Sequence, residues 1–293
     1  MCSITAGKYE GILEVHEKMK LSLMTLTLRP LLQSGEMRLA DVFALARETG
    51  FEAVEFSMPD YSGYPVEQVR DLLDQHGLKA SCVNRMYELA SDDPAVTSSE
   101  IQAVKKMVDD AEQLGAPVIM VVPTRMFLTM EQDAKPAAAE KFAAAFRDII
   151  AYAAPKGIAV TFEDFPSLRV PLCGISEVRR LLQSVEGLKL TFDNGNFYPS
   201  GDDMLDAYAQ LWPHVANVHV KEWERSDTRT DIECVDGTFL KGGLHGKGLL
   251  DQRGFLRALK ERAYDGYIGF EYQGNLHPAQ AVREGAAYLK SVM

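Results

Sequence analysis

Cysteine is scarce in this sequence, and long apolar runs are absent from it. The four cysteines among its 293 residues stand at positions 2, 82, 173 and 234, with no CxxC pair. This scatter favours reduced thiols over a disulfide framework. No stretch has the length of a membrane-spanning helix, and the first twenty residues lack the apolar segment of a signal peptide. We therefore expect a cytoplasmic protein that does not bind membranes.

Positive charge is also in short supply. The chain has 31 lysines and arginines against 42 aspartates and glutamates, which gives a formal net charge of −11. This balance provides no general attraction for a phosphate backbone, and no local cluster of basic residues offsets it. The sequence therefore predicts a protein that does not bind nucleic acid.

A glycine-rich turn is missing where an open doubly wound sheet would carry one. Such a sheet binds phosphate at a turn directly after its first strand, and here that place reads TLRPLLQSG. Instead, eight β-rich runs alternate with segments whose apolar residues recur at helical spacing. The predicted strands are 20–28, 53–58, 79–84, 117–123, 158–164, 188–194, 215–222 and 267–272. Eight alternating units predict an α/β protein with a single (β/α)8 barrel.

The barrel accounts for residues 20–293, which we expect to form one catalytic domain after an N-terminal extension, 1–19. Apolar residues in this extension recur at roughly helical spacing, so it would pack against the barrel or against a partner subunit of a homo-oligomer. Two connecting segments, 124–139 and 223–251, exceed ordinary βα loops. Because both follow strands, they are expected over the barrel mouth, where long loops usually serve function.

Four of the predicted strands end in a side chain that can bind a metal. The runs VTFE, LTFD, NVHV and GFEY carry Glu163, Asp193, His219 and Glu271. Side chains alternate between the two faces of a strand. In all four runs the metal-binding residue shares its face with small or polar residues, while large apolar residues point the opposite way. This common phase predicts that the four side chains converge at the mouth of the barrel.

Three carboxylates and one imidazole suit a single divalent cation. Mn²⁺ is the first expectation, and Mg²⁺, Co²⁺ and Zn²⁺ also fit such a ligand set. Without a cation the carboxylates would repel one another strongly. A bound cation would hold the carbonyl and the adjacent hydroxyl of a carbohydrate, and Glu163 and Glu271 would remove and return a proton.

These residues resemble the site of the xylose isomerase-like sugar isomerases and epimerases, including the D-tagatose 3-epimerase group. In that family Glu, Asp, His and Glu at the ends of strands 5 to 8 bind one divalent metal, and the two glutamates act as acid and base. The resemblance extends to GFEAVEF at 50–56 and to VHVKEW at 218–223. It implies a metal-dependent isomerase or epimerase that works through an enediolate on a ketose, a sugar acid or a cyclitol.

Six further residues are candidates for contact with this carbohydrate substrate. The resemblance implies Glu55 on strand 2 and Arg225 beyond strand 7. It also points to Asn196, because the family's DxxH motif reads DNGN here and Asn196 stands in place of the histidine. Of the other three, Lys221 shares its strand face with His219, Arg85 follows a strand, and His245 lies in the loop that overhangs the mouth. Each also fits a structural role, as an ion-pair partner or a solvated loop residue. The candidates are Glu55, Arg85, Asn196, Lys221, Arg225 and His245.

Three other functions remain open. A dehydratase of the inosose dehydratase type would use the same scaffold and the same first proton transfer, followed by loss of hydroxide. An endonuclease IV-like DNA repair nuclease would need a three-zinc cluster rich in histidine, whereas this chain is acidic and has six histidines in total. A non-catalytic sugar-binding protein would have no evident use for an intact ligand set.

Overall fold

The computed structural model describes residues 19–58 and 60–293, so all but the last residue of the predicted N-terminal extension lies outside the described residues. Eight parallel strands close into a barrel in the order β1-β11-β7-β6-β5-β4-β3-β2. The strands are β1 (Lys20–Met24), β2 (Ala53–Ser57), β3 (Lys79–Met86), β4 (Val118–Val122), β5 (Ala159–Glu163), β6 (Lys189–Asp193), β7 (Val215–Val220) and β11 (Tyr267–Phe270). Pairing of β1 with β11 closes the barrel. The predicted (β/α)8 barrel is confirmed, and the open sheet is excluded.

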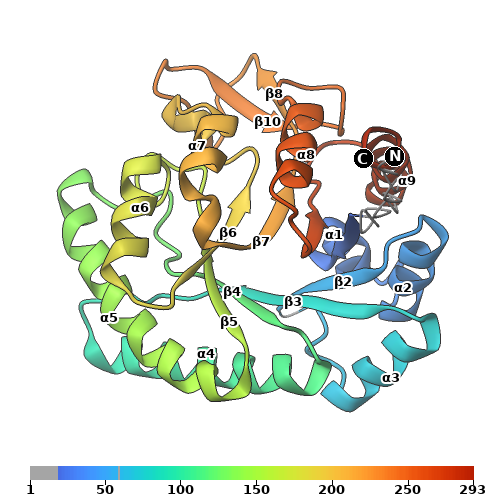
Figure 1. Cartoon of the computed structure of the whole chain (residues 1–293), viewed down its shortest axis with the longest axis horizontal. Helices are drawn as coiled ribbons and strands as arrows, with labels where there is room; N and C mark the ends of the chain where they lie inside the picture. The colour runs from blue at the N-terminus through green and yellow to red at the C-terminus, as the bar shows by residue number, and fades with distance from the viewer. Residues whose placement is uncertain (1–18, 59) are drawn as a thin grey trace, which may run out of the picture.

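Helices surround the strands (Figure 1). They are α1 (Thr25–Ser34), α2 (Leu39–Glu48), α3 (Val66–His76), α4 (Pro94–Leu114), α5 (Lys135–Ala153), α6 (Ile175–Ser184), α7 (Met204–Leu211), α8 (Gln252–Glu261) and α9 (Pro278–Val292). Short 3-10 turns are η1 (Gln132–Ala134), η2 (Ala154–Lys156), η3 (Tyr198–Ser200) and η4 (Trp212–His214). Within the described part of the chain, no helix combines the length and apolarity needed to cross a membrane.

The first strand is shorter than the sequence predicts, because the chain turns into α1 at Thr25. Two threonines that favour a β conformation are held instead by tertiary hydrogen bonds. Thr25 accepts one from the backbone N–H of Ser57 at 2.9 Å, and Thr27 accepts one from that of Tyr272 at 3.0 Å. These long-range contacts override the local β propensity, so the prediction of strand over residues 25–28 was wrong.

A small antiparallel sheet interrupts the segment after β7. It consists of β8 (Trp223–Ser226), β10 (Phe239–Gly242) and β9 (Ile232–Glu233), in that order. Trp223, Cys234 and Leu240 form its own apolar cluster. Figure 1 shows β8 and β10 beyond the end of β7, so this sheet extends one wall of the barrel mouth, as expected for the long segment 223–251.

The two faces of the strands differ as the alternation predicts. Phe162, Phe192, Val218 and Phe270 lie on the outer face and belong to the main core beneath the helices. On the inner face, the hydroxyls of Thr161 and Thr191 are hydrogen bonded at 2.7 Å. The outer face therefore supplies the packing between barrel and helices, and the inner face is left for polar chemistry.

Candidate active site

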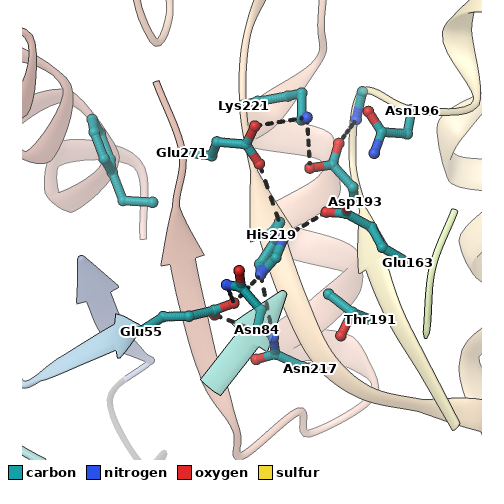
Figure 2. A network of polar contacts seen from close by, with 12 residues as sticks. Glu55, Asn84, Glu163, Thr191, Asp193, Asn196, Asn217, His219, Lys221 and Glu271 are labelled. Atoms are coloured by element: carbon teal, nitrogen blue, oxygen red, sulfur yellow. Dashed lines mark hydrogen bonds and ion pairs between the residues drawn. The ribbon is translucent and has the colours of Figure 1, made fainter. Parts of the chain in front are cut away.

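The four predicted metal ligands converge at the carboxyl-terminal end of the barrel strands (Figure 2). Glu163 and Asp193 are the last residues of β5 and β6, His219 is the fifth residue of β7, and Glu271 directly follows β11. One ligand atom from each lies within 4.8 Å of those of the others, and all four side chains are buried. Across residues 19–58 and 60–293, this is the single group of its kind.

The strand register explains the convergence. Asp193 stands beside His219 across the β6–β7 pair, and Glu163 stands beside Thr191 across β5–β6. Neighbouring strands lie about 4.8 Å apart, so equal phase at adjacent strand ends brings their tips within reach of one cation. The alternation argued from the sequence is the physical cause of the cluster.

Electrostatics in this cluster favour a cation. Burial, with repulsion from Glu271 and Glu163, raises the pKa of Asp193 to about 7 despite the attraction of Lys221. Asp193 Oδ2 is buried without a hydrogen-bond partner, although Lys221 Nζ lies 3.4 Å away. An unsatisfied carboxylate oxygen costs free energy in a dry site. Oxygen and imidazole donors in this arrangement fit a hard or borderline divalent ion.

His219 is held by partners on both ring nitrogens. Nδ1 faces the cluster, at 2.6 Å from Glu163 Oε1 and 3.9 Å from Glu271 Oε2. Nε2 points away from the cluster and lies 2.9 Å from Glu55 Oε1. A carboxylate behind a histidine fixes the ring orientation and leaves the other nitrogen free to bind a metal.

Glu55 on β2 is the centre of a buried hydrogen-bond network beneath the site (Figure 2). The amide of Asn84 donates to Oε1 at 2.7 Å, and that of Asn217 donates to Oε2 at 3.3 Å. Burial opposes the negative charge, but attraction by His219 and these hydrogen bonds outweigh it and lower the pKa of Glu55. The side chain is fully buried and does not line the pocket. This geometry suits orientation of His219, and contact of Glu55 with a substrate stays a prediction.

Space for the imidazole comes from a glycine on the closing strand. A Cβ at Gly269 would lie 2.7 Å from His219 Cδ2 and 3.1 Å from Glu55 Oε2. Gly269 pairs with His219 across β11–β7. The absence of a side chain at this position thus permits the contact between His219 and Glu55.

Lys221 follows β7 and reaches the pocket as its parity predicts. Its Nζ donates to Glu271 Oε1 at 3.1 Å and lies 5.3 Å from the centre of the Trp223 ring. Burial opposes the charge, yet Asp193 and Glu271 raise the pKa of Lys221. The lysine is therefore a buried cation that partly neutralises the carboxylates, in a position to contact a substrate.

Two other candidates support the site from outside the pocket. His245 is buried, lies with its ring centre 4.3 Å from that of Phe270 in a tilted arrangement, and has Nε2 3.0 Å from the backbone oxygen of Glu271. Burial lowers the pKa of His245 to about 4, so the ring is neutral at pH 7. Asn196 is fully buried and donates to the backbone oxygen of Asp164 at 2.7 Å. Neither side chain lines the pocket, and contact of His245 and Asn196 with a substrate stays a prediction.

The two arginine candidates divide between the pocket and the surface. Arg85 lines the pocket and packs over the ring of Tyr87 at 5.5 Å. Arg225 lies on β8, is exposed and does not line the pocket. The small sheet presents Arg225 to solvent, and its contact with a substrate stays a prediction.

One buried acid was missed by the sequence reasoning. Asp164 directly follows Glu163 and accepts a hydrogen bond from the backbone N–H of Asp193 at 2.9 Å. Burial and repulsion from Asp193 raise the pKa of Asp164 well above its usual range. The sequence shows Glu163 and Asp164 together at the end of the fifth strand, but strand alternation predicts that only Glu163 points into the barrel mouth.

A cavity of about 620 Å³ opens above the cluster. Its polar end includes Glu163, Lys221 and Glu271, and its remaining walls come from loops after the strands and from the small sheet. Ionisable groups gathered at this end of the strands are typical of enzymes with this fold. Fold and site together define an enzyme-type barrel with a candidate metal centre.

The chain belongs to the xylose isomerase-like TIM barrel family, whose model matches residues 43–292. A ketose 3-epimerase of Arthrobacter globiformis is 26% identical over 236 residues, which cover 77% of this chain and 74% of that protein. A probable 3-DHS dehydratase, AsbF of Bacillus anthracis, superposes with a TM-score of 0.74 at 18% identity, covering 93% and 99% of the two chains. The IOLI protein, solved with a zinc atom, gives 0.75 at 17% identity over 94% and 99%. The two structures establish similarity of fold.

Proposed function

We propose that this protein is a divalent-metal-dependent isomerase or epimerase that moves a proton on a ketose, sugar acid or cyclitol. The observation that carries the proposal is the placement of Glu163 and Glu271 on separate strands beside His219 and Asp193 in one buried cluster. The similarity to a ketose 3-epimerase supports a small carbohydrate as substrate. Within residues 19–58 and 60–293 the structure holds one four-residue cluster with a single histidine, which favours this reading over a histidine-rich three-zinc nuclease.

The cluster would have two roles, metal binding and proton transfer. Glu163, Asp193, His219 through Nδ1, and Glu271 would be the ligands, with Mn²⁺ as the first candidate and Mg²⁺, Co²⁺ or Zn²⁺ as alternatives. When bound, the ion would supply Lewis-acid stabilisation of negative charge on the substrate oxygens.

Proton transfer would then fall to the two glutamates. One carboxylate would accept the proton from the carbon beside the carbonyl, which leaves an enediolate, and the other would return a proton. Lys221, hydrogen bonded to Glu271, would stabilise the developing negative charge.

The experiment is exchange of carbon-bound hydrogen with D₂O, followed by NMR on a panel of ketoses, sugar acids and inososes. Exchange should require added Mn²⁺, stop on chelation, and fall by at least about a hundredfold in Glu163→Gln and in Glu271→Gln. Glu186→Gln is the matched control, because Glu186 is exposed and lies before β6, at the opposite end of the barrel. Full exchange in the metal-stripped protein would refute the mechanism.

A dehydratase is the second candidate, because Lys221 gives the pocket a buried N–H donor beside Glu271. It would protonate a departing hydroxyl after the same first proton transfer. Exchange accompanied by loss of water from the product would favour the dehydratase, and exchange with retention of all oxygens would favour the isomerase or epimerase.

A further inference from the structure

Methionine is concentrated on one side of the cavity. Met24, Met58, Met86 and Met120 all line it, which is four of the twelve methionines in the chain. They come from β1, the segment after β2, β3 and β4, and thus from the half of the barrel that contributes none of the four candidate ligands.

Aromatic side chains continue the same wall above the strands. Phe127 and Phe165, from the loops after β4 and β5, lie with their ring centres 5.3 Å apart and also line the cavity. Ser57, Asn84 and Arg85 also line the cavity on this side, but a sugar hydroxyl placed against the methionine and aromatic side chains themselves would lose its hydrogen bonds to water without replacement, which disfavours binding there. Methionine and aromatic side chains instead suit an apolar group, and methionine adapts to groups of different shape.

The cavity is also larger than a free sugar requires. A hexose has about twelve heavy atoms, and at about 30 Å³ for each water-sized group it fills at most about 360 Å³. More than a third of the 620 Å³ remains.

The charged residues around the cavity give less support to an anionic substituent. Arg29 is paired with Asp60 at 2.6 Å, Arg125 with Glu100 at 2.9 Å, and Lys241 lies 3.6 Å from Glu224. Lys221 is committed to the carboxylates of the candidate metal site. Arg85 alone among the lining cations has no carboxylate partner within the described residues.

From the methionine wall and the unfilled volume, we infer that the substrate is a keto sugar bearing an apolar substituent away from its carbonyl, such as an aryl or alkyl glycoside whose ring also carries a ketone. The inference rests on the proposed function for the reacting end of the molecule. The sugar carbonyl and its neighbouring hydroxyl would lie at the carboxylate cluster, and the substituent would lie against the wall formed by Met24, Met58, Met86, Met120, Phe127 and Phe165.

Calorimetric titration of the Mn²⁺-loaded protein with methyl glucoside, phenyl glucoside and glucose 6-phosphate tests this assignment. Phenyl glucoside should bind at least about tenfold more tightly than methyl glucoside, because it buries several more carbon atoms. Equal affinity for the two glycosides would overturn the inference, as would tighter binding of the phosphate.

Two polar substitutions locate the effect on the wall. Met86→Gln and Met58→Gln, at half-buried positions, should each reduce the preference for phenyl over methyl at least about threefold. Met37→Gln is the control, since Met37 is half-buried but does not line the cavity, and it should keep the preference. If Met37→Gln changes the preference as much as the wall variants do, the wall is not the binding surface.

The proton-exchange experiment distinguishes failure of this inference from failure of the proposed function. Metal-dependent exchange on free ketoses without a preference for phenyl glucoside would remove the substrate class alone. A phenyl preference without exchange on any carbohydrate would remove the proposed function.

Discussion

Replacement of Glu55 by glutamine tests whether a buried carboxylate prepares His219 to bind a metal. The substitution keeps the shape of the side chain but removes the negative charge that faces Nε2 at 2.9 Å. Asn84 and Asn217 both donate to this carboxylate, so the new amide group would place a donor against existing donors. We expect the imidazole to lose its fixed orientation, with Nδ1 no longer held toward Glu163.

Loss of such a supporting carboxylate typically weakens metal binding by 10- to 100-fold. This range corresponds to about 1.4 to 2.7 kcal/mol of binding free energy. Titration calorimetry of Mn²⁺ into metal-free protein measures the effect directly, with Glu186→Gln as the matched control. Saturating Mn²⁺ should restore much of the lost proton exchange, because on this reasoning Glu55 acts on metal binding through His219.

An affinity within about twofold of the unsubstituted protein would refute the reasoning. Thermal unfolding of the metal-free proteins shows whether the substitution also destabilises the fold. If Glu55→Gln unfolds at a much lower temperature without metal, Asn217→Ala offers a second route, because it removes one donor to Glu55 and leaves the carboxylate in place. That variant should weaken Mn²⁺ binding by a smaller factor.

Two further predictions concern the same ring and its surroundings. Gly269→Ala should also lower the affinity for Mn²⁺ by at least about tenfold, because the new Cβ would meet His219 at 2.7 Å; unchanged calorimetric affinity would contradict the fit. Acid should destabilise the protein through His245, since a histidine whose folded pKa is about 4 instead of 6.5 takes up its proton more readily when unfolded. The stability from this residue is present above pH 6.5 and is lost by pH 4, about 3 kcal/mol in total. Urea unfolding of His245→Gln should therefore show a shallower fall over this pH range, and an identical slope would exclude the burial effect.

Much of the site was predictable because strand alternation is a local property. The residues within three positions of Glu163 or Asp193 are enough to show which face of the strand carries the carboxylate. Closure of the barrel then brings the strand ends together around one site. The structure places all four expected ligands in one cluster. Lys221 and Arg85 also line the pocket, as expected for Lys221 from its shared parity with His219 and for Arg85 from its place after the predicted strand 79–84.

The remaining roles depend on contacts between distant parts of the chain. Glu55 and His219 are separated by 164 residues, and no local pattern indicates that one orients the other. His245 sits in a loop that does overhang the barrel, but whether it turns toward the pocket or toward Phe270 is decided by packing against β11 and α8. The turn into α1 at Thr25 was likewise decided by partners in β2 and after β11, outside any local window.

The link between Glu55 and His219 also ties the candidate metal centre to closure of the barrel. Strands β2 and β7 are not neighbours, because β1 and β11 stand between them on the closing side. The 2.9 Å contact therefore spans the barrel interior and passes over Gly269 on β11. Because β1 and β11 join β2 to β7 on this side of the barrel, the contact that orients His219 depends on the closed barrel. Metal affinity is, on this argument, a property of the completed barrel and not of the β5–β7 segment that supplies three of the four ligands.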